Sequence, residues 1–173
     1  REAFADSARS RAAPPGSWLS RGPERYPSRP RPSRERTVHF REILDPACTR
    51  HDLTAASRKR ALELASELIA ARHPAMEPGT LFDALMARER LGSTAVGEGV
   101  AIPHCRLPGC ATPTGALLHL HETVDFEAPD GERVDLLFVL VVPEEATDAH
   151  LALLADVAGA MNRSAFREAL RDA

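Results

Sequence analysis

The 173-residue sequence is poor in lysine and cysteine, and both shortages exclude classes of site. Lys59 is its only lysine, so the chain lacks the lysine that follows the glycine-rich loop of nucleotide-binding proteins. Its three cysteines, Cys48, Cys105 and Cys110, form an odd set without a Cys-x-x-Cys pair. That argues against a disulfide framework and a structural zinc site, and it favours a reducing cytoplasm.

Large aromatic residues and long apolar runs are also scarce. Trp18 and Tyr26 are the only tryptophan and tyrosine, so any core in the remaining chain has phenylalanine as its aromatic residue. The longest apolar run, Val134–Val142, is interrupted by Asp135 and is too short to cross a bilayer. We expect neither membrane insertion nor a nucleic acid partner.

Charge divides the chain into two parts. Residues 1–37 hold nine arginines against four acidic residues, a net charge of +5, and the chain total of −3 leaves −8 for residues 38–173. The first part also has six prolines, six serines and few aliphatic residues, so it cannot bury enough apolar surface to offset its chain entropy. We therefore predict a disordered extension over residues 1–37 and one folded domain over residues 38–173.

Apolar periodicity predicts two helices in the first half of the domain. One begins near Asp52-Leu53-Thr54 and runs to about Arg72, with apolar residues at the i, i+3, i+4, i+7 spacing. Pro74 and Pro78 break it. A second runs from about Thr80 to Gly92 and places Arg88 in its last turn.

Three strand-like runs follow these helices, namely Val100–Ile102, Gly115–His121 and Val134–Val142. The last is typical of a central strand covered on both faces by helices. The stretch Ala128-Pro129-Asp130-Gly131 predicts a turn that makes the second and third runs neighbours. We predict an α/β fold, a small mixed β-sheet flanked by helices.

Two further helices are expected at the C-terminal end. Thr147 is the predicted N-cap of the first, which reaches about Asn162. Its buried face is predicted from four apolar residues at helical spacing: Leu151, Leu154, Val157 and Met161. His150 falls in its first turn, where unpaired N–H groups favour anions and a neutral imidazole. Ser164 is the predicted cap of a final helix, Ala165–Arg171.

The stretch from Arg88 to His104 delivers one histidine from a short apolar strand into a glycine-rich loop. Pro103 stiffens the backbone that presents His104. Glycines let the backbone approach a ligand closely, and hydroxyls add donors for an anion. The predicted binding loop for a phosphoryl group consists of Gly92, Ser93, Thr94, Gly97 and Gly99. His104 is the candidate phosphoryl acceptor.

The other histidines give weaker signals. His39, His51 and His73 are assigned to helix flanks or the surface. His119 and His121 share one strand face at a spacing that can chelate a metal, but the sequence positions no carboxylate or cysteine to complete the shell. A half-exposed strand face is the favoured interpretation for this pair.

The stretch Arg88–His104 closely resembles the active-site segment of enzyme IIA domains of the bacterial phosphotransferase system, mannitol/fructose class. Their pattern reads R-E-x-L-G-S-T-x-(I/V)-G-x-G-(I/V)-A-I-P-H, and every fixed position is present. The resemblance, which spans about His39 to the end, implies that His104 accepts a phosphoryl group from a histidine phosphocarrier protein and that Arg88 supports the site. His150, 46 residues further on, is implied to bond the phosphoryl group or the acceptor ring.

The sequence also departs from that family. Family members usually continue for another short helical stretch, so we expect a clipped C-terminus. Cys105 stands where glycine often follows the active histidine, and it is followed by a basic residue, Arg106, as is usual in the family. A side chain at that place could crowd the incoming donor or make the site redox-sensitive.

The predicted function is therefore a phosphohistidine carrier, a phosphotransferase component that needs no metal, nucleotide or other cofactor. A free-standing unit most resembles the nitrogen-regulatory branch, whose partner is a regulated protein. Three alternatives stay open: a fructose- or mannitol-specific component that serves a sugar permease, a binding-only regulator whose histidine never turns over, and, less favoured, a His/Cys metal-binding protein.

Overall fold

The computed structural model describes residues 40–145 and 148–173, all within one compact unit, Glu35–Ala173. The predicted extension 1–37, His39 and the predicted cap Thr147 lie outside the described residues. In chain order the elements are α1 (Phe40–Ile43), β1 (Leu44–Leu53), α2 (Arg58–Arg72), α3 (Pro78–Arg90), β2 (Ala95–Gly97), β3 (Val100–Ala101), β4 (His104–Leu107), β5 (Thr114–Val124), β6 (Val134–Pro143), α4 (Asp148–Met161) and α5 (Ser164–Arg171). No helix among the described residues is long and apolar enough to span a membrane.

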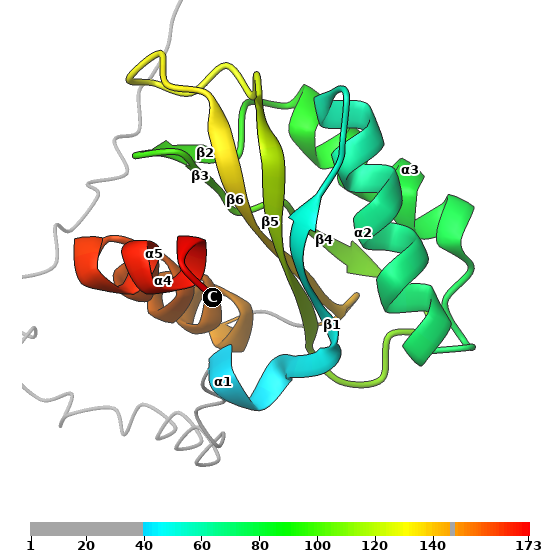
Figure 1. The fold of residues 1–173 in the computed structure, drawn as a ribbon. Coiled ribbons are helices and arrows are strands. Elements are labelled where there is room, and N and C mark those ends of the chain that lie inside the picture. Colours follow the sequence, from blue (N-terminus) through cyan, green and yellow to red (C-terminus); the bar gives the residue numbers. More distant parts are fainter. Residues whose placement is uncertain (1–39, 146–147) are drawn as a thin grey trace, which may run out of the picture. The chain divides into compact units, whose positions relative to one another are not determined.

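The six strands form one mixed sheet in the order β1-β5-β6-β3-β2. β4 also pairs with β6, at residues that follow those paired with β3. β1 runs parallel to β5, and both β3 and β4 run parallel to β6. The pairs β5–β6 and β2–β3 are antiparallel. Helices α2 and α3 cover one face of the sheet, while α1, α4 and α5 lie on the other (Figure 1). The predicted α/β fold with a flanked mixed sheet is confirmed.

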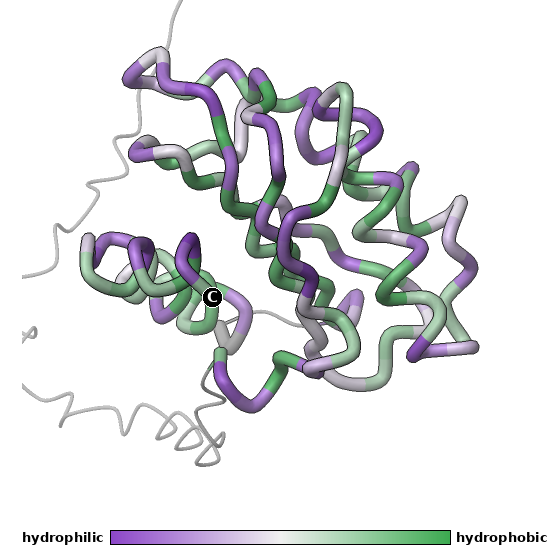
Figure 2. The backbone as a smooth tube through the Cα atoms, in the orientation of Figure 1, coloured by the Kyte–Doolittle hydropathy of each residue, from purple (hydrophilic) through white to green (hydrophobic). Residues whose placement is uncertain are grey.

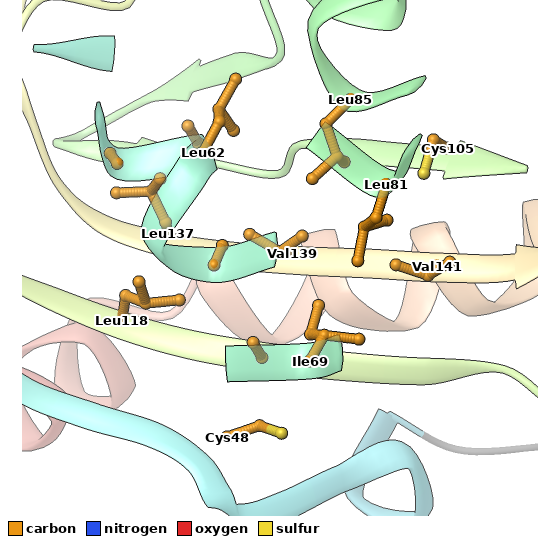
Figure 3. Close-up of a cluster of buried hydrophobic side chains, with 14 of the residues drawn as sticks. Cys48, Leu62, Ile69, Leu81, Leu85, Cys105, Leu118, Leu137, Val139 and Val141 are labelled. Atoms are coloured by element: carbon orange, nitrogen blue, oxygen red, sulfur yellow. The ribbon is translucent and has the colours of Figure 1, made fainter. Parts of the chain in front are cut away.

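Strand β6 is the centre of this arrangement, and it is apolar along most of its length (Figure 2). Leu137, Val139 and Val141 face α2 and α3, where they meet side chains such as Leu62 and Leu81 (Figure 3). The alternating set faces α4: Leu136, Phe138, Leu140 and Val142. Because successive side chains of a strand point to opposite faces, one strand contributes to both cores. The predicted central strand is confirmed.

The turn before β6 is also confirmed. Gly131 has a φ of +75° and donates its N–H to the Ala128 carbonyl oxygen at 2.9 Å. This tight turn makes β5 and β6 adjacent antiparallel strands, with Leu118 opposite Leu137. Proline, aspartate and glycine at these positions favour such a turn through their backbone preferences.

The predicted helix start at Asp52-Leu53-Thr54 is wrong. Asp52 and Leu53 end strand β1, and the helix begins at Arg58 after Ser57, whose hydroxyl accepts the Arg60 N–H at 3.2 Å. β1 forms one edge of the sheet, and Cys48 is its one buried residue. It therefore lacks the apolar alternation by which a strand is detected, and its hydrogen bonds come from β5, far along the chain.

Both C-terminal helices are present, but two details differ from prediction. Val157 and Met161 are core residues and Leu154 packs against the core, as predicted, whereas Leu151 is 66% exposed and Leu153 and Ala160 are buried. α4 is rich in apolar residues around its circumference, so spacing alone wrongly added Leu151 to the face that packs. Ser164 is the first residue of α5, and the N-cap is Arg163, which makes no side-chain capping bond.

Candidate functional site

His104 opens strand β4 directly after the Ile102-Pro103 break that separates β3 from β4. The Pro103 carbonyl oxygen accepts the Leu140 N–H at 2.9 Å, which fixes this point of the chain to the central strand. The Nδ1 atom of His104 lies 2.9 Å from the Ile102 carbonyl oxygen. A carbonyl oxygen only accepts, so Nδ1 holds the proton and Nε2 presents its lone pair.

Arg88 meets that second nitrogen. Its Nε–H donates to Nε2 of His104 at 3.2 Å, and its Nη1–H donates to the Gly92 carbonyl oxygen at 3.0 Å. The side chain extends from the last turn of α3, as predicted. Bonds to both a ring nitrogen and a backbone carbonyl give the guanidinium a defined orientation beside His104.

His150 completes the group from the first turn of α4. Its ring lies edge-on to that of His104, with the ring centroids 5.6 Å apart. The residue is buried, and within the described part of the chain its Nε2 atom has no hydrogen-bond partner. A buried polar atom without a partner costs free energy in the resting protein, so it is available to a transient group at this place.

Burial sets the electrostatics of both rings. It lowers the pKa of His104, the neighbouring Arg88 cation lowers it further, and the bond to Ile102 and the charge of Glu89 oppose the shift. Burial also lowers the pKa of His150, with smaller contributions from His104 and Arg106. Near neutral pH the site therefore contains two neutral imidazoles beside one guanidinium. Such a site offers a nucleophilic nitrogen in a positive potential.

Two charged residues beside these rings, Arg106 and Glu89, were given no role in the sequence analysis. Arg106 lies two residues after His104 on β4, so both occupy the same face of the strand, and period-two alternation was a signal that could have found it. Glu89 is the buried residue next to Arg88. Its identity alone gives no sign of which groups its carboxylate contacts.

The predicted binding loop separates into two parts in the structure. The carbonyl oxygen of Gly92 accepts a hydrogen bond from Arg88. The Ser93 hydroxyl donates to the Phe126 carbonyl oxygen at 2.5 Å, and that of Thr94 donates to Glu89 at 2.5 Å. Both hydroxyls are therefore engaged in holding the fold, contrary to their predicted use as free donors for an anion.

Gly97 and Gly99 are not brought to His104, which corrects their predicted place in the loop. The Gly99 carbonyl oxygen accepts the N–H groups of Asp135 and Leu136 of β6, whereas His104 pairs with Leu140, further along β6. Four strand residues span about 13 Å. Gly97 instead ends β2 and Gly99 lies in the turn before β3, both at positive φ.

The Gly99 position excludes a side chain. A Cβ there would lie 2.5 Å from an Nη atom of Arg171 and 2.7 Å from Asp135 Oδ1, two groups bonded to each other. We expect Gly99→Ala to lower the free energy of unfolding by about 2–4 kcal/mol, from left-handed strain and the broken ion pair together. Gly131 has a similar φ of +75° but open space, so Gly131→Ala reports the strain alone, about 1–2 kcal/mol. Urea denaturation measures the free energy of unfolding of both variants. Equal losses of stability would show that the contact of the added Cβ with Arg171 and Asp135 contributes nothing.

Cys105 does not face the site. It is 6% exposed and lies in the core cluster under α3 (Figure 3). Burial raises the pKa of its thiol to about 12, so the reactive thiolate does not form near neutral pH. The expectations of a crowded or redox-sensitive site are wrong, because strand alternation turns residue 105 away from the face of His104.

The remaining histidines have separate partners. The ring of His119 lies 4.2 Å from that of His51, and His121 Nδ1 donates to Asp52 Oδ1 at 2.6 Å. His73 contacts the Thr114 hydroxyl at 2.9 Å. Among the residues that the structure describes, no group of three or more His, Cys, Asp and Glu is placed to hold a metal ion. His119 and His121 thus occupy a partly exposed strand face.

Comparison with known proteins places the chain among characterised relatives. Residues 42–173 match the family model described as "Phosphoenolpyruvate-dependent sugar phosphotransferase system, EIIA 2". A nitrogen regulatory protein of Pseudomonas aeruginosa is 48% identical over 136 residues, which cover 79% of this chain and 88% of that protein. The crystal structure of nitrogen regulatory protein IIA-Ntr from Neisseria meningitidis has a TM-score of 0.71 and 42% identity, and it covers 75% of this chain and 88% of its own.

A sugar-specific protein is similar at lower identity. The fructose-specific EIIA component of Haloferax volcanii is 32% identical over 117 residues, which cover 68% of this chain and 73% of that protein. The chain is therefore similar both to nitrogen regulatory proteins and to a fructose-specific component.

Proposed function

The chain belongs to the EIIA 2 family of the phosphoenolpyruvate-dependent sugar phosphotransferase system, and from this premise we propose that it is a phosphoryl carrier whose acceptor atom is Nε2 of His104. One observation supports the proposal above the others. Nδ1 of His104 is fixed to the Ile102 carbonyl oxygen, so the lone pair of Nε2 points toward Arg88 while the His150 ring lies alongside.

The reaction needs a donor that already holds an activated phosphoryl group, for which we propose a histidine phosphocarrier protein. Nε2 of His104 attacks the phosphorus in line, and the P–N bond of the donor breaks with its electron pair returning to the donor ring. The His104 ring becomes cationic as its own P–N bond forms. The Ile102 carbonyl oxygen, which accepts the Nδ1–H, stabilises that charge.

The equatorial phosphoryl oxygens need positive partners during this step. Arg88 is bonded to Nε2 in the resting site, so its guanidinium is at hand when the phosphoryl group replaces that bond. His150 supplies a second donor from its unpartnered Nε2. Arg106 adds positive potential beside His150. The described residues thus provide a nucleophile and charge stabilisation for the transfer.

For the downstream partner we propose a regulated protein. The nitrogen regulatory proteins of P. aeruginosa and N. meningitidis, at 48% and 42% identity, favour this branch over the fructose-specific component at 32%. The alternative is a sugar permease component as the acceptor. We place the carrier in the cytoplasm, where its three free thiols persist.

Phosphoryl acceptance is tested by intact-mass analysis of the full chain after incubation with phosphorylated phosphocarrier protein. We expect a gain of one phosphoryl group, which is lost again when excess unphosphorylated phosphocarrier is added. Inorganic phosphate should give no gain. A chain that binds the phosphocarrier but never gains mass would overturn the proposal and leave a binding-only regulator.

The lowered pKa of His104 predicts how acceptance depends on pH. The neutral ring is the nucleophile, and burial moves its pKa below the ordinary value of 6.5, so the neutral form persists as the pH falls through 6.5. We expect the pseudo-first-order rate of phosphorylation to fall on the acid side with a midpoint below pH 6.5. An imidazole titration by NMR on the free protein measures the same pKa without the donor.

The same shift has a consequence for stability. A histidine whose pKa is lower in the folded state binds protons more readily when unfolded, so its contribution is fully present above pH 6.5 and is lost as the pH falls toward the folded pKa. Stability and acceptance should therefore decline on the acid side. A titration midpoint at or above 6.5 for His104 would contradict both expectations.

A further inference from the structure

Behind the site lies a carboxylate that the transfer chemistry does not use. The Glu89 side chain is 2% exposed, so its charge is removed from water. Three donors compensate for this: the Thr94 N–H at 3.2 Å, the Thr94 hydroxyl at 2.5 Å and Arg58 Nη1 at 3.4 Å. A buried carboxylate that is bonded twice by one residue holds that residue's backbone in a defined position.

The two bonded residues belong to the two segments that form the site. Glu89 is adjacent to Arg88 in the last turn of α3, and Thr94 begins the segment that leads through β2 and β3 to His104. The Thr94 carbonyl oxygen accepts the Ile102 N–H at 2.9 Å, and the Ile102 carbonyl oxygen in turn accepts the Nδ1–H of His104.

These bonds reach both nitrogens of the acceptor ring. On one side, Arg88 contacts Nε2. On the other, the path from Glu89 runs through Thr94 and Ile102 to Nδ1. The contact of Glu89 with Thr94 therefore contributes to the separation between the end of α3 and the strand that bears His104.

We propose that Glu89 and Thr94 are positioning residues for phosphoryl transfer, which hold Arg88 and His104 at the separation and orientation that the reaction needs. The proposal rests on the proposed function of His104. Displacements of about 1 Å at a reacting centre reduce rates on the order of a hundredfold, so a contact of this kind affects catalysis without touching substrate. The negative charge of Glu89 also raises the pKa of His104, whereas the positive charge of Arg88 lowers it.

Two substitutions and two controls separate positioning from simple stabilisation. Glu89→Gln keeps the size of the side chain but removes its charge, and Thr94→Val removes the hydroxyl while keeping the shape. Thr94→Ser restores the hydroxyl. Glu127→Gln is the matched control, because Glu127 accepts from the same arginine, Arg58 Nη2 at 2.9 Å, but is 70% exposed and has no link to Thr94.

Single-turnover phosphorylation is measured for each full-length variant well below its own melting temperature, and nitrogen-15 NMR reports the tautomer and pKa of His104. We expect Glu89→Gln and Thr94→Val to slow transfer on the order of tenfold or more, and to alter the nitrogen signals of His104. In Glu89→Gln the pKa of His104 should fall. Thr94→Ser and Glu127→Gln should retain the wild-type signals and most of the rate.

The proposal is overturned if folded Glu89→Gln transfers at the wild-type rate with unchanged His104 signals. Should Glu89→Gln fail to fold, the comparison of Thr94→Val with Thr94→Ser decides, and equal rates and signals in those two would overturn it as well. The NMR comparison needs no phosphoryl donor. A wild-type chain that never gains mass therefore refutes the proposed function, whereas a wild-type rate together with unchanged ring signals in a folded variant refutes only the positioning role.

Discussion

His104→Ala should abolish phosphoryl acceptance, the largest effect that we expect from any single substitution. Alanine removes Nε2, the nitrogen beside Arg88 that we propose as the acceptor. The neighbouring His150 is not an equivalent acceptor, because its Nε2 has no hydrogen-bond partner among the described residues, whereas the Ile102 carbonyl oxygen fixes the tautomer of His104 and Arg88 contacts its Nε2. Intact-mass analysis after exposure to phosphorylated phosphocarrier measures the result.

A histidine away from the site provides the control. His121 is exposed and bonds to Asp52 at the opposite sheet edge, so His121→Ala should gain mass like the wild-type chain. Circular dichroism confirms that both variants are folded. If folded His104→Ala still gains one phosphoryl group, the acceptor is another residue and the assignment fails.

Arg88→Ala should slow transfer by about a hundred- to a thousandfold while leaving the acceptor in place. Removing one preorganised donor from a transition state that gains negative charge costs about 2.7–4 kcal/mol, which converts to this range. Lysine should not restore the rate fully, because the arginine bonds His104 through Nε and Gly92 through Nη1 at once. Rapid-quench measurement at saturating donor isolates the transfer step.

Arg90→Ala is the matched control for this prediction. Arg90 lies in the same last turn of α3, but its side chain is exposed and makes none of the contacts described for His104. Its removal alters net charge to the same extent as Arg88→Ala and should change the rate little. Equal slowing in both variants would assign the effect to long-range charge instead of to the guanidinium at Nε2.

Sequence reasoning was strongest where local pattern and final environment agree. The Val134–Val142 run is apolar because both of its faces are covered, and the turn at Gly131 follows from backbone preference. It failed at β1, which has one buried residue and whose strand partner is distant in the chain. Local pattern cannot show a strand whose order comes from long-range pairing.

The site shows the same division. Proximity of Arg88, His104 and His150 was implied by the family resemblance, and the structure brings the three together. The tautomer of His104 depends on a carbonyl oxygen two residues earlier, and such a contact follows from the path of the backbone, not from residue type. For the same reason Gly97 and Gly99 were misplaced, since glycine marks a tight turn without showing what the turn approaches.

The four-residue strand β4 also constrains how this gene segment can change over time. Its alternation puts His104 and Arg106 on one side and Cys105 and Leu107 in the core. Substitutions that respect this alternation keep the frame, but inserting a single residue between Pro103 and His104 would turn the imidazole inward and the Cys105 thiol outward. We therefore expect this segment to tolerate changes of composition and to reject changes of length.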